Sequence, residues 1–142
     1  MEHPSTALQR RLAEALIPRS EVLEAYLFGS HALGRAQPHS DIDVAVYVDP
    51  HALMGPHEYG YAADLTSYLM VQIGTNAIDL VVLNEAPPLL YHRVLRDGHR
   101  VLSRDLRATT TREGYALSRY WDYVPALAKI EAARRASRTK TL

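Results

Sequence analysis

The sequence predicts an α/β fold in which a short mixed sheet is flanked by helices and followed by a C-terminal helical segment. Apolar runs of strand length alternate with segments whose apolar residues recur at helical spacing. From about residue 105 to about residue 136 the pattern is helical throughout. Because 142 residues with 47% hydrophobic composition can bury one core, we expect a single domain over residues 1–142, with its main body at about 20–105.

The first half of the chain is expected to form two helices and two strands. Residues 6–17 carry a helical apolar stripe, and Pro18 ends it. The apolar runs at residues 22–28 and 42–48 are typical of strands. Residues 57–73 again have leucines at helical spacing, which predicts the second helix.

The second half is expected to alternate between strands and helices and then to become helical. Its elements are a strand at 77–83, a helix opened by Pro87 and Pro88 and stopped by Gly98, a short strand at 100–103 and a helix at 105–136. Pro125 should kink or restart the last helix. Leu117, Trp121 and Val124 form its apolar stripe; such a stripe is typically buried in a core, and a partner interface is the alternative.

Three acids lie on the second and third expected strands. Side chains alternate along a strand, so Asp41 and Asp43 point to one face while Ile42 points to the other. Two adjacent carboxylates repel each other unless a cation lies between them, and Mg²⁺ is the natural ion. Asp79 lies inside an otherwise apolar strand, where an acid needs a partner. It could complete a metal site and accept a proton from an attacking hydroxyl.

Gly29 and Ser30 directly follow the first expected strand. A glycine there lets the backbone approach a phosphate closely, and the amides of a following short helix would point at the anion. The spacing from Gly29 to Gly34 resembles a P-loop, but Arg35 and Ala36 stand where the P-loop requires lysine and a hydroxyl residue. A P-loop NTPase is therefore not expected.

The segment GSHALGRAQPHSDID, followed later by AIDLVVL, resembles the nucleotidyltransferase superfamily of DNA polymerase β, whose mark is Gly-Ser, Asp-x-Asp and a third acid on a later strand. The short chain and the segment PPLLYHRVLRDGHRVLSRD resemble its smallest branch, the minimal nucleotidyltransferase (MNT) proteins. Many MNT proteins are antitoxins encoded beside HEPN-domain ribonuclease toxins. They commonly carry an arginine just after Gly-Ser, where this chain has His31, Ala32 and Leu33, and Arg35 is the nearest candidate.

The resemblance implies a Mg²⁺-dependent enzyme that moves AMP from ATP to a hydroxyl, namely a tyrosine of a partner HEPN toxin, within a hetero-oligomer. It implies these residue roles: Asp41, Asp43 and Asp79 in catalysis and in holding two Mg²⁺ ions, and Gly29, Ser30 and Ser40 in binding the nucleotide. Neither a membrane nor direct nucleic-acid binding is expected. Two alternatives stay open: a non-catalytic antitoxin that masks its partner, and a transferase acting on a small molecule.

Composition limits the remaining possibilities. Cysteine is absent, which excludes disulfides and thiolate zinc sites and favours the cytoplasm. No apolar run resembles a signal peptide or reaches membrane-spanning length. Residues 1–85 hold 11 acidic and 4 basic side chains, whereas residues 86–142 hold 5 acidic and 12 basic ones. The basic half suits a nucleoside triphosphate, RNA or an acidic partner, unless its arginines merely solvate helix faces.

Overall fold

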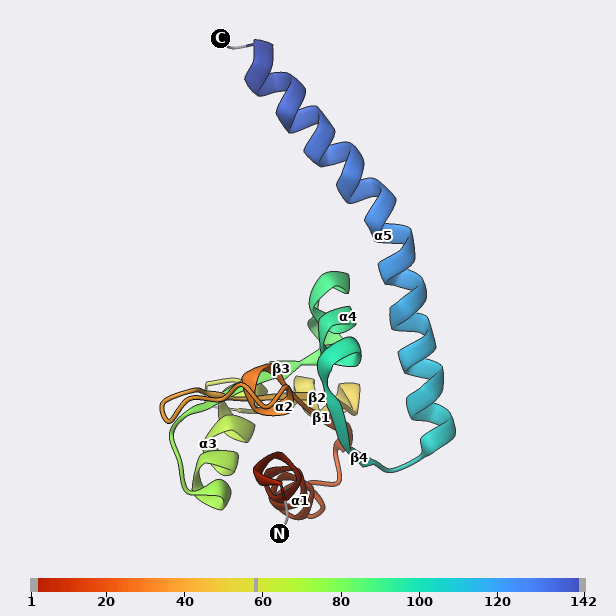
Figure 1. Cartoon of the computed structure of the whole chain (residues 1–142). Helices are drawn as coiled ribbons and strands as arrows, with labels where there is room; N and C mark the ends of the chain where they lie inside the picture. Colours follow the sequence, from red (N-terminus) through yellow and green to blue (C-terminus); the bar gives the residue numbers. More distant parts are fainter. Residues whose placement is uncertain (1–2, 58, 141–142) are drawn as a thin grey trace.

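The computed structural model describes residues 3–57 and 59–140, and its centre is a four-stranded sheet with the strand order β3-β2-β1-β4 (Figure 1). The strands are β1 (Val22–Phe28), β2 (Ile42–Val48), β3 (Ile78–Val82) and β4 (His99–Ser103). β2 and β3 are parallel, whereas β1 is antiparallel to both β2 and β4. The sheet is therefore short and mixed, as expected.

Helices cover both faces of the sheet (Figure 1). α1 (Pro4–Leu16) and α3 (Tyr61–Ile73) pack on one face. α4 (Pro88–Asp97) packs on the other face, and the long α5 (Leu106–Lys140) packs against α4. The short helical turns are α2 (Gly29–Ala32), η1 (Pro50–Met54) and η2 (Leu83–Glu85). The α4 face is the one that matters for the site.

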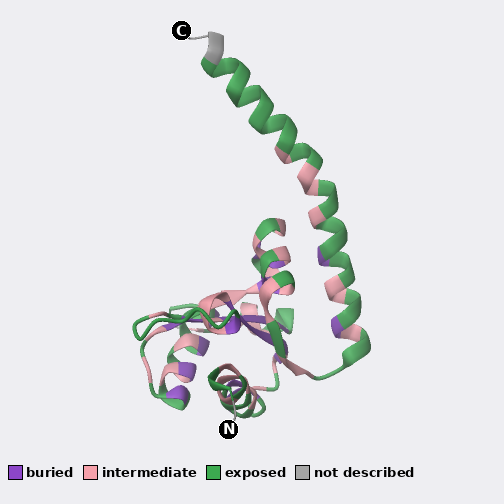
Figure 2. Ribbon diagram, in the orientation of Figure 1, coloured by how far each residue is buried: buried purple, intermediate pink, exposed green. Residues whose placement is uncertain are grey.

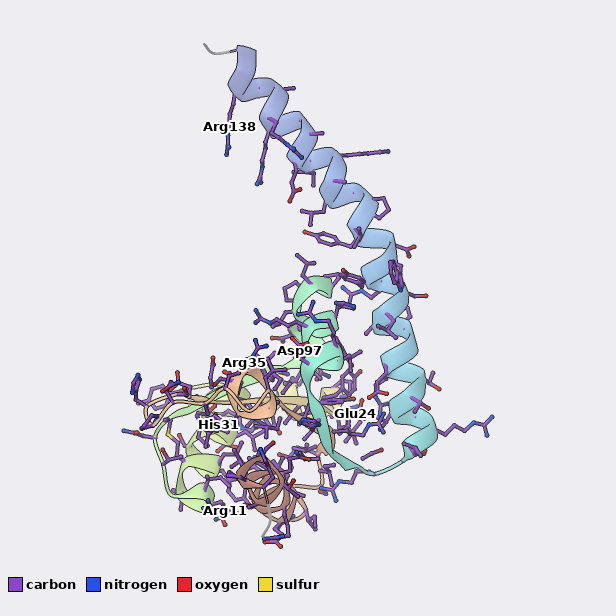
Figure 3. All side chains as sticks on the ribbon, in the orientation of Figure 1. Arg11, Glu24, His31, Arg35, Asp97 and Arg138 are labelled. Carbon is purple, nitrogen blue, oxygen red and sulfur yellow. The ribbon has the colours of Figure 1, made fainter. Side chains whose placement is uncertain are left out.

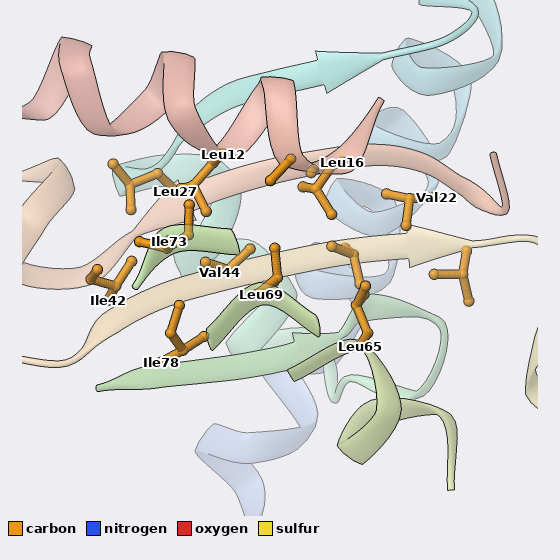
Figure 4. Packing of buried hydrophobic residues seen from close by; sticks show 14 of the residues in the cluster. Leu12, Leu16, Val22, Leu27, Ile42, Val44, Leu65, Leu69, Ile73 and Ile78 are labelled. Carbon is orange, nitrogen blue, oxygen red and sulfur yellow. The ribbon is translucent and has the colours of Figure 1, made fainter. Parts of the chain in front are cut away.

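The pleat of β2 decides which side chains reach each face. Ile42, Val44 and the other even-numbered residues of the strand are buried against α1 and α3, where leucines of both helices interlock with them (Figure 4). Ala45 and Tyr47 belong to the cluster on the α4 side. Asp43 follows the same alternation, so its carboxylate lies on the α4 side.

Most predicted boundaries agree with the structure within a few residues. The helix expected from residue 57 begins only at Tyr61, because Gly60 precedes it with a φ of +92° and breaks the helical path. The helix expected from residue 6 begins at Pro4, where proline costs nothing because the first helical amide has no partner. The expected helix at 105–136 is one continuous helix, with Pro125 inside it, that runs to Lys140.

The last turns of α5 project away from the sheet, and residues 128–138 are all exposed (Figure 2). α5 has 35 residues and α4 has 10, which correspond to helices of roughly 52 and 15 Å. α5 therefore extends well beyond the end of α4, the helix on which it packs. The core prediction is wrong for Trp121, which is 67% exposed although the ring of its neighbour Tyr120 stacks on His92 of α4. In the described part of the chain, no helix, α5 included, is both long and apolar enough to cross a bilayer.

Candidate active site

The sheet register brings the Gly-Ser turn and two of the acids together. Asp43 is directly opposite Asp79 across the parallel pair β2 and β3. On its other side Asp43 is opposite Phe28, the last residue of β1. Gly29 and Ser30 come next and begin α2. Asp43 therefore lies between the Gly-Ser turn and Asp79 at one end of the sheet.

A cavity of about 510 Å³ opens at this end of the sheet. Its polar lining residues are Ser30, Arg35, Asp43, Asp79, Arg93 and Asp97, and Gly29 and Leu90 contribute further wall. We call it the carboxylate cavity. Asp41 and Ser40 are not among the described residues that line it. Asp41 is exposed just before β2, and the Ser40 hydroxyl accepts a hydrogen bond from the Gln37 amide at 2.8 Å, which closes the loop.

Gly29 is needed for a reason that the sequence did not indicate. Its φ is +73°, a conformation that side chains disfavour, and a Cβ added there would overlap the Asp43 carboxylate oxygen Oδ2. The absent side chain thus makes room for the acid. Any residue larger than glycine would displace Asp43, so the turn and the carboxylate form one unit.

The carboxylates repel one another. Burial raises the pKa of Asp43 above its ordinary value, the charges of Asp79 and Asp41 raise it further, and the charges of Arg93 and His31 act in the opposite direction. A hard cation among these oxygens would relieve the repulsion, and carboxylate oxygens are the donors that Mg²⁺ prefers. Within the described residues, no three His, Asp or Glu side chains already converge as ligands of one ion. Mg²⁺ is commonly held by one or two carboxylates, so a bound substrate would supply the remaining ligands.

Arg93 is a site residue that the sequence analysis missed. It lies on the exposed side of α4, lines the carboxylate cavity and acts electrostatically on Asp43. Among the described residues, its guanidinium has no hydrogen bond or ion pair. The available signal was the spacing of Leu90, Arg93 and Asp97, which places the three on one helix face directly after the strand that carries Asp79.

Asp97 faces the same space from the end of α4, opposite Arg35 on the loop after α2 (Figure 3). Hydrogen bonds from Arg96, both at 2.9 Å, lower the pKa of Asp97, and the charges of Arg93 and Arg35 lower it further. The cavity therefore has two carboxylates on the sheet, and Asp97 with the guanidinium groups of Arg93 and Arg35 on α4 and the loop after α2. This arrangement can hold a polyanion together with cations.

Comparison with known proteins agrees with this geometry. Residues 10–107 match the family model described as polymerase beta, nucleotidyltransferase. No curated protein matches the sequence. The family model spans the Gly-Ser turn, all three acids and α4, so it covers the whole carboxylate cavity.

Several solved structures share the fold. One is the tri-AMPylated Shewanella oneidensis HEPN toxin in complex with MNT antitoxin, with a TM-score of 0.67, 19% identity, and 92% of this chain and 98% of that chain covered. Another is a toxin-antitoxin with AMP-PNP, with a TM-score of 0.59, 20% identity, and 94% and 97% covered. A third is the toxin-antitoxin MntA-HepT, with a TM-score of 0.53, 20% identity, and 96% and 97% covered. The predicted fold is confirmed.

Proposed function

Because the chain belongs to the polymerase beta nucleotidyltransferase family, we propose that it transfers AMP from ATP to a hydroxyl group of a partner protein and thereby acts as an antitoxin. The observation that carries this proposal is the opposition of Asp43 and Asp79 across β2 and β3, beside the Gly-Ser turn, in one cavity. Opposed carboxylates beside a phosphate-sized turn suit the displacement of pyrophosphate from a nucleoside triphosphate.

In this proposal Asp41, Asp43 and Asp79 hold two Mg²⁺ ions, which would neutralise the triphosphate and the departing pyrophosphate. Asp79, exposed on the edge strand β3, accepts the proton of the acceptor hydroxyl. The acceptor oxygen forms a bond to the α-phosphorus of ATP. The bond from that phosphorus to the bridging oxygen breaks, and pyrophosphate leaves. The products are an AMP ester of the acceptor and pyrophosphate.

The triphosphate would be held by the Gly-Ser turn beside Asp43 and by two arginines of the cavity. Gly29 and Ser30 offer a backbone turn and a hydroxyl, and Arg35 and Arg93 offer guanidinium groups that make no side-chain hydrogen bond or ion pair among the described residues. MNT proteins commonly carry an arginine just after Gly-Ser, but this chain has His31, Ala32 and Leu33 at those positions. Arg35 and Arg93 would supply the missing positive charge. Ser40 would contribute indirectly, by closing the loop that leads to Asp41.

The acceptor in this proposal is a tyrosine of a HEPN toxin. Support comes from the similar complex in which the HEPN toxin is AMPylated and bound to an MNT antitoxin. The projecting part of α5 would bind the toxin, because residues 128–138 expose Ile130 together with basic side chains, and Trp121, also exposed, lies on the turns before them. Docking would bring the tyrosine to Asp79 without a second domain.

The test is intact-mass spectrometry of the co-purified HEPN partner after incubation with ATP and Mg²⁺. The parent chain should add one or more AMP units, and the Asp43→Asn variant should add none. The projecting part of α5 also favours a second function, in which the chain neutralises the toxin by binding and covering it without modifying it. If Asp43→Asn neutralises the toxin fully and the parent adds no AMP, masking is the function.

A further inference from the structure

A second cavity, of about 470 Å³, lies between α4 and α5. We call it the α4–α5 cavity; its main lining residues are Pro87, Leu89, His92, Arg96, Tyr120 and Tyr123. Leu90 and Arg93 line both this cavity and the carboxylate cavity. The two spaces therefore adjoin along one side of α4, and Leu90 and Arg93 stand between them.

The lining of the α4–α5 cavity suits a flat ring. Pro87 and Leu89 provide apolar wall, and the rings of His92 and Tyr120 stack with centroids 3.6 Å apart and planes 5° from parallel. His92, Tyr120 and Tyr123 are only half-buried, so they retain surface for a ligand. No carboxylate is among the described residues of this lining, and its charged groups are guanidinium donors. Such a space accepts a planar, neutral ring with acceptor nitrogens, which describes a purine base.

The direction of the transfer reaction places the nucleoside on this side. In an in-line displacement the acceptor and the leaving pyrophosphate lie on opposite sides of the α-phosphorus. In the proposed reaction the acceptor approaches at Asp79, on the edge strand β3, and the pyrophosphate lies near Gly29 and Ser30, which begin α2. The nucleoside must extend in a third direction, and α4 bounds the carboxylate cavity there through Leu90 and Arg93.

From this adjacency and this lining we infer that the α4–α5 cavity binds the purine base of the nucleotide, with Arg93 beside the sugar and phosphates. The inference rests on the proposed nucleotidyltransferase function and adds a base subsite to it. Because Tyr120 and Tyr123 belong to α5, this inference gives α5 two roles. It contributes to the nucleotide site, and its projecting part is the proposed binding surface for the toxin.

The experiment compares calorimetric titrations of Mg²⁺–ATP and of Mg²⁺–tripolyphosphate, which lacks base and sugar. Tyr123→Ala should raise the dissociation constant for ATP about tenfold and leave that for tripolyphosphate unchanged, because it removes only a ring beside the base. Leu89→Trp, at a position 44% exposed, should fill the cavity without disturbing the core and have the same selective effect. Tyr115→Ala, on the same helix and 69% exposed outside the cavity, is the matched control and should change neither.

The outcomes separate this inference from the function on which it rests. If folded Tyr123→Ala and Leu89→Trp bind ATP as tightly as the parent, or lose ATP and tripolyphosphate equally, the base subsite is wrong. If those variants keep ATP affinity but lose AMP transfer to the partner, the cavity binds the acceptor instead, and the inference is overturned. If the parent binds neither ligand in the presence of Mg²⁺, the proposed function itself fails.

Discussion

Glu24, in the middle of β1, accepts two hydrogen bonds from the Arg112 guanidinium of α5, at 2.7 and 2.6 Å, and is fully buried. The Thr109 hydroxyl donates a third, at 2.9 Å. One ion pair thus joins the centre of the sheet to the base of the long helix. Because α5 forms one wall of the α4–α5 cavity, this pair also fixes the position of that wall.

Removing Arg112 should leave the Glu24 carboxylate buried without its partner. We expect Arg112→Leu to lower the free energy of unfolding by about 3–5 kcal/mol, measured by urea denaturation, because an unpaired buried charge is far costlier than a lost surface contact. The control is Arg107→Leu, an exposed arginine one turn earlier on α5, which should change stability by less than about 0.5 kcal/mol. Equal effects of the two substitutions would contradict this account of the pair.

Gly29 and Gly34 make a matched pair for testing the Gly-Ser turn. Both have a positive φ, of 73° and 70°, but only at Gly29 would a Cβ meet another residue, Asp43. Each change to alanine should cost about 1–2 kcal/mol of stability because of the backbone conformation. Only Gly29→Ala should also displace the carboxylate and weaken Mg²⁺–ATP binding, by roughly tenfold or more. Calorimetry that shows the same ATP affinity for both variants would refute the coupling.

Arg93 should contribute to nucleotide binding through its charge. Arg93→Gln should weaken binding of both Mg²⁺–ATP and Mg²⁺–tripolyphosphate by roughly 10- to 100-fold, because a hydrogen bond to a charged group is worth about 1.5–3 kcal/mol. Arg107→Gln, which carries the same change outside both cavities, is the control. Fluorescence titration that gives unchanged affinities for Arg93→Gln would remove this residue from the site.

Glu21 should make stability depend on pH. Burial acts to raise the pKa of Glu21, but hydrogen bonds from Arg19 at 2.9 Å and Tyr61 at 2.8 Å outweigh it, and the pKa is lowered. A lowered pKa in the folded state means that this contribution is complete above the ordinary glutamate pKa and is lost as the pH falls through the folded value. Urea unfolding should show a larger stability difference between the parent and Glu21→Gln at about pH 6 than at about pH 3. A difference independent of pH would show that the carboxylate charge is not involved.

The sheet was predictable because its strands carry their own pattern. The bounds of β1 and β2 agree with the apolar runs. The alternation of side chains along β2 correctly predicted that Asp43 and Val44 lie on different faces of the sheet. The pairing that opposes Asp43 and Asp79 could not be read from spacing alone, because register depends on how the strands meet.

The contribution of α4 and α5 was not predictable in the same way. Arg93 reaches the carboxylate cavity only because the buried side of α4 packs on β1. This packing could not be predicted from the sequence. The exposure of Trp121 was missed for a related reason. An apolar stripe indicates a face that could pack, but α5 turns Tyr120 and Tyr123 toward α4 and leaves Trp121 exposed.

The most direct measurement uses ATP that carries radioactive phosphorus at either the α or the γ position. The labelled ATP is incubated with the chain, Mg²⁺ and the HEPN partner, and the fate of the label is followed. Nucleotidyl transfer at the carboxylate cavity predicts that α-label becomes covalently attached to the partner and that γ-label is released as pyrophosphate. Asp43→Asn and Asp79→Asn should each abolish the attachment while the folded complex persists. Attachment of the γ-label, or undiminished attachment of the α-label by both folded variants, would contradict the proposed reaction.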